Sequence, residues 1–84
     1  MRVTLYTLAA GCPLCDEALH HLERLASRLA FDLRVVPVDG VPQLAIRHAL
    51  RVPVLEVDGR EVLFGRMTLE AVEAALRGAG PPRG

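Results

Sequence analysis

The chain has 84 residues, enough for one domain of modest stability, because a chain of this length buries only roughly 60–65% of its unfolded surface. Its ten basic residues, all arginine, balance ten acidic ones. The lack of a basic excess argues against nucleic acid or an anionic membrane as a partner. No stretch approaches the roughly 20 apolar residues of a membrane span, and the start of the chain does not resemble a signal peptide. We therefore expect a cytoplasmic protein that acts as a monomer.

The chain contains two cysteines, Cys12 and Cys15. A disulfide between residues three apart closes too small a loop to stabilise a fold. In a reducing cytoplasm such thiols stay free or cycle between oxidised and reduced states. The pair therefore predicts redox chemistry or metal binding.

The first half of the chain predicts a strand, a helix and a second strand. A β-rich run over residues 3–8 ends at Gly11, and Pro13 suits the first position of a helix because no amide hydrogen is needed there. A second strand is expected over residues 31–38, parallel to the first because the connection is a right-handed crossover. The helix between them has the i, i+3, i+4, i+7 spacing of one apolar face, formed by Ala18, Leu19, Leu22, Leu25, Ala26 and Leu29.

The second half predicts a short helix, a hairpin and a last helix. The short helix spans residues 41–50, and two strands, residues 53–57 and 61–64, flank an Asp-Gly turn, a strong hairpin signal. Thr68 is the expected N-cap of the last helix, which ends at Gly78. The predicted order is βαβαββα, an α/β thioredoxin-like fold with a four-stranded mixed sheet flanked by helices. This domain covers residues 1–78, and residues 79–84 form a flexible tail.

The position of the two cysteines indicates how they would react. A C-x-x-C pair at the start of a helix can form a disulfide, and the helix amino end stabilises a thiolate. Cys12 lies outside the first turn, where solvent can reach it, whereas Cys15 shares the inner face with Leu19 and Leu22. We therefore expect Cys12 to be the attacking nucleophile and Cys15 to resolve the mixed disulfide.

The motif Cys12-Pro13-Leu14-Cys15 resembles the active site of glutaredoxins, and residues 2–78 are similar to the short bacterial glutaredoxin-like proteins. Arg51-Val52-Pro53-Val54 stands where this superfamily has its cis-proline. The resemblance implies thiol–disulfide oxidoreductase activity, with Pro13 and Leu14 beside the substrate. It also implies a cis Pro53 against the cysteines and a Val52 backbone that pairs with the substrate.

The sequence departs from glutaredoxins where they bind glutathione. Leu14 replaces the usual tyrosine, and no basic residue precedes Cys12 closely. The segment from Gly65 through Arg66 has one glycine and no aspartate, so Arg51, Gly65 and Arg66 are only candidate substitutes for the family's anchors. We therefore expect disulfide-bearing proteins or small thiols as substrates, and weak dependence on glutathione. A low-molecular-weight thiol or a thioredoxin reductase would supply electrons, and no cofactor is expected beyond the Cys12–Cys15 disulfide.

The alternative is a non-enzymatic copper- or zinc-binding domain that uses the same C-x-x-C pair. A structural zinc centre takes four ligands, and only two thiols are present. His20 points away from the Cys15 face of the helix and His21 lies on its flank. Copper-carrying domains have the order βαββαβ, which ends on a strand. We therefore assign no metal site, and expect His20, His21 and His48 at the surface or its boundary and Tyr6 in the core.

Overall fold

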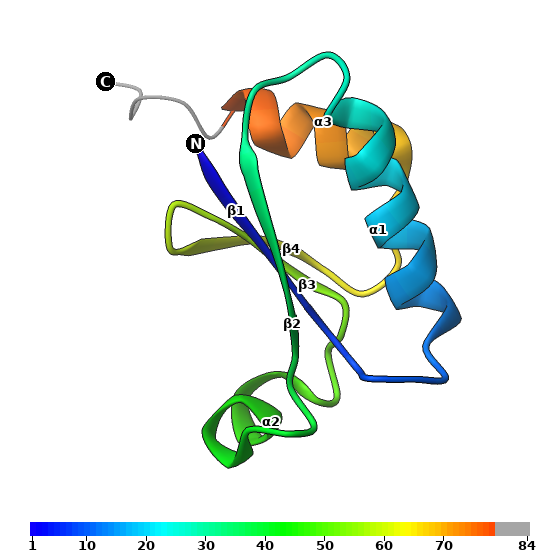
Figure 1. The fold of residues 1–84 in the computed structure, drawn as a ribbon, viewed down its shortest axis with the longest axis vertical. Helices are drawn as coiled ribbons and strands as arrows, with labels where there is room; N and C mark the ends of the chain where they lie inside the picture. Colours follow the sequence, from blue (N-terminus) through cyan, green and yellow to red (C-terminus); the bar gives the residue numbers. More distant parts are fainter. Residues whose placement is uncertain (79–84) are drawn as a thin grey trace.

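The computed structural model describes residues 1–78 and confirms the predicted order of elements (Figure 1). The expected tail, residues 79–84, lies outside the described residues. Within residues 1–78, no helix has the length and apolar character needed to cross a bilayer. The elements are β1 (Arg2–Thr7), α1 (Pro13–Leu25), β2 (Asp32–Pro37), α2 (Pro42–His48), β3 (Val54–Val57), β4 (Arg60–Phe64) and α3 (Leu69–Gly78).

The four strands form one mixed sheet in the order β2-β1-β3-β4. The central strand β1 pairs in parallel with β2 and antiparallel with β3, and β3 pairs antiparallel with β4. Asp58 and Gly59 form the predicted tight turn, with φ of 51° and 83°, the positive values that a two-residue hairpin turn requires. The register shifts by one residue beyond Leu55, so β4 carries a bulge.

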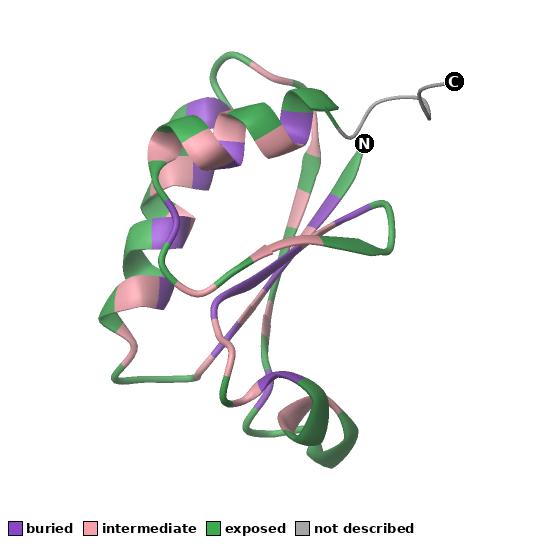
Figure 2. Cartoon of the chain, turned by 180° about the vertical axis from the view of Figure 1, so that it is seen from behind, coloured by how far each residue is buried: buried purple, intermediate pink, exposed green. Residues whose placement is uncertain are grey.

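One face of the sheet is covered by α1 and α3, and the core lies between these two helices and the sheet. Figure 2 shows buried positions on the sides of both helices that face the sheet. Each fully buried Leu or Val side chain contributes about 1.5–3 kcal/mol relative to exposure. The core consists of Val3, Leu5, Ala18, Leu22, Leu25, Leu55, Val57, Met67, Val72 and Leu76.

Two helix ends differ in how well local signals predicted them. The apolar spacing of α1 runs on to Leu29, but the helix ends at Leu25, whose carbonyl oxygen accepts from the N–H groups of both Arg28 and Leu29 at 2.9 Å. Ala26, expected on the buried face, is exposed in this turn. At the start of α3, Thr68 is the expected N-cap, because its Oγ1 accepts from the Ala71 N–H at 3.0 Å.

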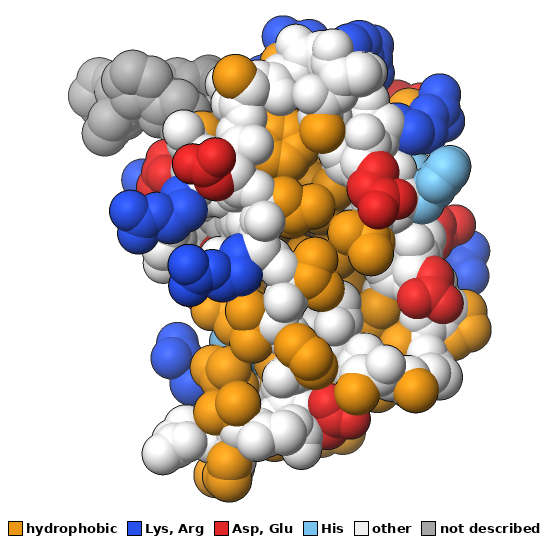
Figure 3. All heavy atoms as spheres, in the orientation of Figure 1, with side chains coloured by type: hydrophobic (Ala, Val, Ile, Leu, Met, Phe, Trp, Pro, Cys, Tyr) orange, Lys and Arg blue, Asp and Glu red, His pale blue; other side chains and the backbone are white. Residues whose placement is uncertain are grey.

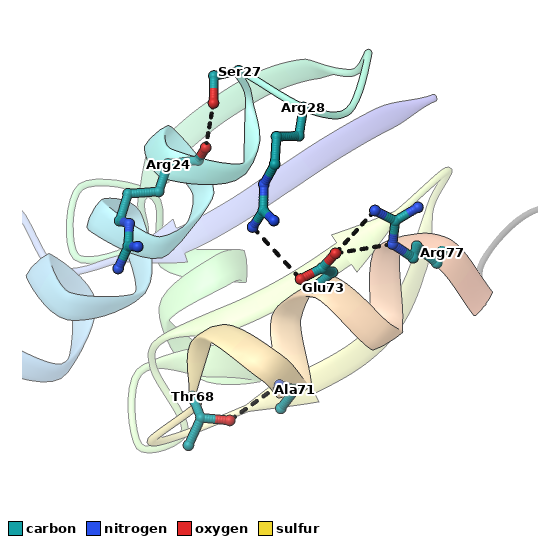
Figure 4. Close-up of polar contacts among 7 residues, drawn as sticks. All are labelled: Arg24, Ser27, Arg28, Thr68, Ala71, Glu73 and Arg77. Carbon is teal, nitrogen blue, oxygen red and sulfur yellow. Dashed lines mark hydrogen bonds and ion pairs between the residues drawn. The ribbon is translucent and has the colours of Figure 1, made fainter.

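An ion-pair cluster joins α1 to α3 at the surface (Figure 4). Glu73 lies between two arginines, at 3.6 Å from Arg28 of the turn after α1 and at 2.9 Å from Arg77 one helical turn further along α3. Exposed pairs of this kind contribute little individually. The packing of the two helices therefore depends on the apolar core beneath this cluster.

The opposite face of the sheet is covered in part by α2. The His48 ring of α2 stacks on Tyr6 of β1, with centroids 4.6 Å apart and planes 24° apart. Because this contact attaches α2 to the sheet, His48 is buried, and its predicted position at the surface or boundary is wrong. Tyr6 is half-buried, and its hydroxyl donates to Glu56 of β3 at 3.2 Å.

The environment of Tyr6 predicts a pH dependence that one spectrum can measure. Burial raises the pKa of the Tyr6 phenol above its ordinary value of 10.0, and the neighbouring Glu56 carboxylate raises it further. Folding therefore favours the neutral phenol. The contribution of this preference to the free energy of unfolding is fully present below the ordinary tyrosine pKa. It is lost as the pH rises through the folded-state pKa.

Tyr6 is the only tyrosine of a chain without tryptophan, so the near-ultraviolet absorbance of tyrosinate reports on it alone. We expect Glu56→Gln to lower the Tyr6 pKa in the disulfide form, because it removes the negative charge beside the phenol. Glu70→Gln, on the exposed surface of α3, is the control and should leave the titration unchanged. Identical titrations of Glu56→Gln and the unchanged protein would contradict the contact.

Candidate active site

Cys12 and Cys15 form a disulfide at the amino end of α1, with Cα atoms 5.2 Å apart. Cys12 is the N-cap residue and Pro13 follows at the start of the helix, as predicted. The Cys15 N–H donates to the Cys12 sulfur at 3.2 Å, so a backbone donor already points at this sulfur atom. Together with the positive end of the helix dipole, this donor favours a thiolate at Cys12 when the bond is reduced.

The two sulfur-bearing side chains differ in exposure. Cys15 is 3% exposed and faces the core with Ala18 and Leu22, whereas Cys12 is only partly buried. Pro13 is exposed and Leu14 is half-buried beside them. A reagent in solution therefore reaches Cys12 before Cys15, which is the asymmetry that the helical spacing predicts.

The segment that leads from β1 to Cys12 is held against the end of β2. The Thr7 backbone carbonyl accepts from the Val38 N–H at 2.8 Å, and the Asp39 carboxylate accepts from the Ala9 N–H at 3.2 Å. Asp39 was not among the predicted site residues. The available signal was its position just beyond the carboxyl end of a strand that lies parallel to β1.

The Val52–Pro53 peptide bond is cis, as the resemblance implies. Pro53 is fully buried and Val52 is half-buried. The Gly65 N–H donates to the Pro53 oxygen at 2.8 Å and to the Arg51 oxygen at 3.2 Å, which holds this loop against the end of β4. Gly65 has a φ of 75°, a left-handed conformation that favours glycine.

Arg51 is engaged with β4. Its guanidinium forms an ion pair with Glu61, and its central carbon lies 4.3 Å from the centroid of the Phe64 ring, a cation–π contact. Sequence reasoning missed Glu61, because an ion pair between residues ten apart depends on the path of the intervening loop. Arg66, the other candidate cation, is exposed and forms no ion pair within residues 1–78.

His20 and His21 lie on α1, and His48 lies on α2. His20 is exposed and His21 is half-buried, in agreement with the surface or boundary positions expected for them. Among the described residues, no three His, Cys, Asp or Glu side chains gather in a group that could hold a metal ion.

A mixed sheet of this topology, with a C-x-x-C disulfide at the start of α1 and a cis-proline before β3, defines a thioredoxin-like protein with a dithiol site. Solved thioredoxins support the fold. A mutant thioredoxin from Halobacterium salinarum aligns with a TM-score of 0.71 at 22% identity over 99% of this chain and 77% of that chain. Thioredoxin 1 from Thermosipho africanus aligns with a TM-score of 0.59 at 16% identity over 96% of this chain and 100% of that chain.

The chain belongs to the glutaredoxin-like domain family (DUF836), whose model matches residues 2–77. A structural-genomics target protein from X. campestris is 36% identical, with a TM-score of 0.75 over 92% of this chain and 97% of that chain. No curated protein matches the chain. Family, fold and the Cys12–Cys15 pair together indicate a redox function.

The difference in exposure predicts the order in which the reduced thiols are alkylated. We expect iodoacetamide near neutral pH to modify Cys12 well before Cys15, because Cys12 is accessible and its thiolate is stabilised at the helix end. Peptide mass spectrometry at short reaction times measures the ratio, and the unfolded chain, in which both thiols are exposed, is the control. Faster labelling of Cys15 in the folded protein would contradict the arrangement.

Proposed function

We propose that this protein is a thiol–disulfide oxidoreductase in which Cys12 attacks the substrate and Cys15 resolves the mixed disulfide. The observation that carries the proposal is the disulfide at the start of α1, with one accessible and one buried cysteine. A structural disulfide would not need this asymmetry, and its three-residue spacing adds little to stability. The apolar core supplies that stability instead.

The reaction follows from the two positions. The Cys12 thiolate attacks one sulfur of the substrate disulfide, a Cys12–substrate bond forms, and the first substrate thiolate leaves and takes a proton from solvent. The Cys15 thiol loses its proton and attacks the Cys12 sulfur, which releases the second substrate thiolate and forms the Cys12–Cys15 disulfide. Two electrons pass from the dithiol to the substrate. A small thiol or a thioredoxin reductase would return the protein to its reduced form.

The loops around the cysteines supply the proposed binding surface. Val52 precedes the cis-proline and is half-buried, and its backbone is the group that would pair with the substrate. Pro53 of this loop is buried, while Pro13 and Leu14 directly follow Cys12 in the chain. We propose a cytoplasmic monomer as the working form, because a reducing compartment returns the dithiol to its reduced form after each turnover.

Glutathione is a poor fit as an obligatory partner. Binding it means holding two carboxylates, each of which needs a cation or a group of backbone amides. Residues 7–11 contain no cation, and Arg51 is already paired with Glu61. The exposed Arg66 and the single Gly65 remain as candidate anchors. We therefore favour protein disulfides or other small thiols as substrates.

The metal-binding alternative gains no support from the architecture. In copper-carrying domains a C-x-x-C also follows the first strand, but their order is βαββαβ. Here α2 separates β2 from β3, and the described part of the chain ends on α3. The cis-proline loop lies at the same end of the sheet as the dithiol, an arrangement that the redox fold would require.

The two cysteine variants should fail in different ways. We expect Cys12→Ser to reduce disulfides no faster than the uncatalysed reaction, because the attacking thiolate is lost. Cys15→Ser should still attack and should accumulate a covalent mixed disulfide, since the resolving thiol is missing. Non-reducing electrophoresis and intact mass measure the adduct. A stable adduct on Cys12→Ser, formed through Cys15, would reverse the two roles.

Glutathione dependence is tested by comparing two substrates at equal concentrations. We expect turnover of a glutathione mixed disulfide to show no saturation at low micromolar concentration, because the anchors for the two carboxylates are incomplete. Reduction of a protein disulfide such as insulin, with dithiothreitol as the electron donor, should proceed. Rapid, saturable turnover of the glutathione substrate would show that Arg66 and the Gly65 turn rebuild the anchors.

A further inference from the structure

Helix α2 exposes the large apolar side chains of its outer face. Ile46 is 86% exposed and Leu50, just beyond the helix, is fully exposed, while the buried residue of α2 is His48. Ala49 keeps helical backbone angles after α2, so Leu50 follows Ile46 by one helical turn on the same side. Val41 and Phe64 of β4 are further exposed apolar side chains in this part of the molecule. An amphipathic helix normally turns such side chains towards a core, so this face is available to a partner.

This face lies at the same end of the sheet as the dithiol. Strands β1 and β2 run in parallel, so their carboxyl ends coincide, one leading to Cys12 and the other to α2. The Ala9 N–H bonded to Asp39 ties the two connections together. In Figure 1 the loop before α1 and helix α2 both lie at the lower end of the molecule, and Figure 3 shows hydrophobic side chains gathered over this region.

The segment that carries this face has only basic charged side chains. Residues 40–55 contain Arg47, His48 and Arg51 and no acidic residue. Arg51 is neutralised by Glu61, whereas Arg47 forms no ion pair with any residue of the described range 1–78. A partner that covers Ile46 and Leu50 therefore meets the exposed Arg47 side chain beside an apolar surface.

We propose that the face formed by Ile46, Leu50 and Arg47 docks protein substrates whose reactive disulfide is flanked by apolar and acidic residues. The proposal rests on the proposed function and defines its substrate class. A small thiol at Cys12 has no reason to contact α2, whereas a polypeptide can react at Cys12 while covering this face. A second copy of the chain fits poorly, because a symmetric contact would place two Arg47 side chains together without an acid between them.

The test measures the first chemical step with three probes that share one leaving group. Each probe is a mixed disulfide with 2-nitro-5-thiobenzoate, whose release is followed by absorbance. The probes are a peptide with Leu and Glu around its cysteine, a peptide with Ser and Lys in the same positions, and 2-mercaptoethanol. The full chain is reduced beforehand and mixed with each probe by stopped flow.

We expect the Leu/Glu peptide to react about tenfold faster than the Ser/Lys peptide, a difference of about 1.4 kcal/mol. Ile46→Ser combined with Leu50→Ser should remove most of this advantage, and Arg47→Glu should remove its salt-sensitive part. The matched control is Arg24→Glu, which reverses an arginine in the last turn of α1 instead of α2. It should leave all three rates unchanged.

The small probe separates the two proposals. All variants should react with the 2-mercaptoethanol probe at the rate of the unchanged protein, because none of the substitutions touches the dithiol. A full Leu/Glu advantage in the Ile46→Ser, Leu50→Ser variant would overturn the docking surface and leave the dithiol function intact. Failure of the unchanged protein on the small probe would overturn both. A dimer in sedimentation that this double variant dissociates would assign the face to a second copy instead.

Discussion

The position of β1 between a parallel and an antiparallel neighbour is the constraint on which the site depends. A parallel neighbour ends where β1 ends, and an antiparallel neighbour begins there. Three connections therefore meet at one end of the sheet: the loop to Cys12, the loop from β2 to α2, and the cis-proline loop before β3. Ala9 and Asp39, 30 residues apart in the chain, are brought together although none of these connections is long.

Side-chain and backbone contacts then hold these connections in place. The Asp39 carboxylate accepts from the Ala9 N–H in the loop before Cys12. The Gly65 N–H donates to the carbonyl oxygens of Arg51 and Pro53, on either side of Val52. Arg51 bonds to Glu61 and lies over Phe64, so a cation that sequence alone would offer to a substrate instead links the cis-proline loop to β4. The core beneath α1 supplies stability that does not depend on the disulfide.

Much of this arrangement was determined by the sequence itself. Several local signals each predicted an element of the fold. They are the β-rich runs of the strands, the one-sided apolar spacing of α1, the Asp-Gly turn and the Thr68 cap. The buried side of Cys15 follows from the same helical period that places Leu22 inward. The C-x-x-C motif and the Val-Pro dipeptide indicated the family, and the family match over residues 2–77 agrees.

Only the tertiary structure decided the features that depend on which surfaces meet. Periodicity shows which residues of α2 share a face, but not that His48 would be buried on Tyr6 while Ile46 and Leu50 stay exposed. The partner of Arg51 depends on how a ten-residue loop and hairpin return to the sheet, which no local pattern encodes. The end of α1 at Leu25, four residues before its apolar spacing stops, depends likewise on the turn that leads into β2.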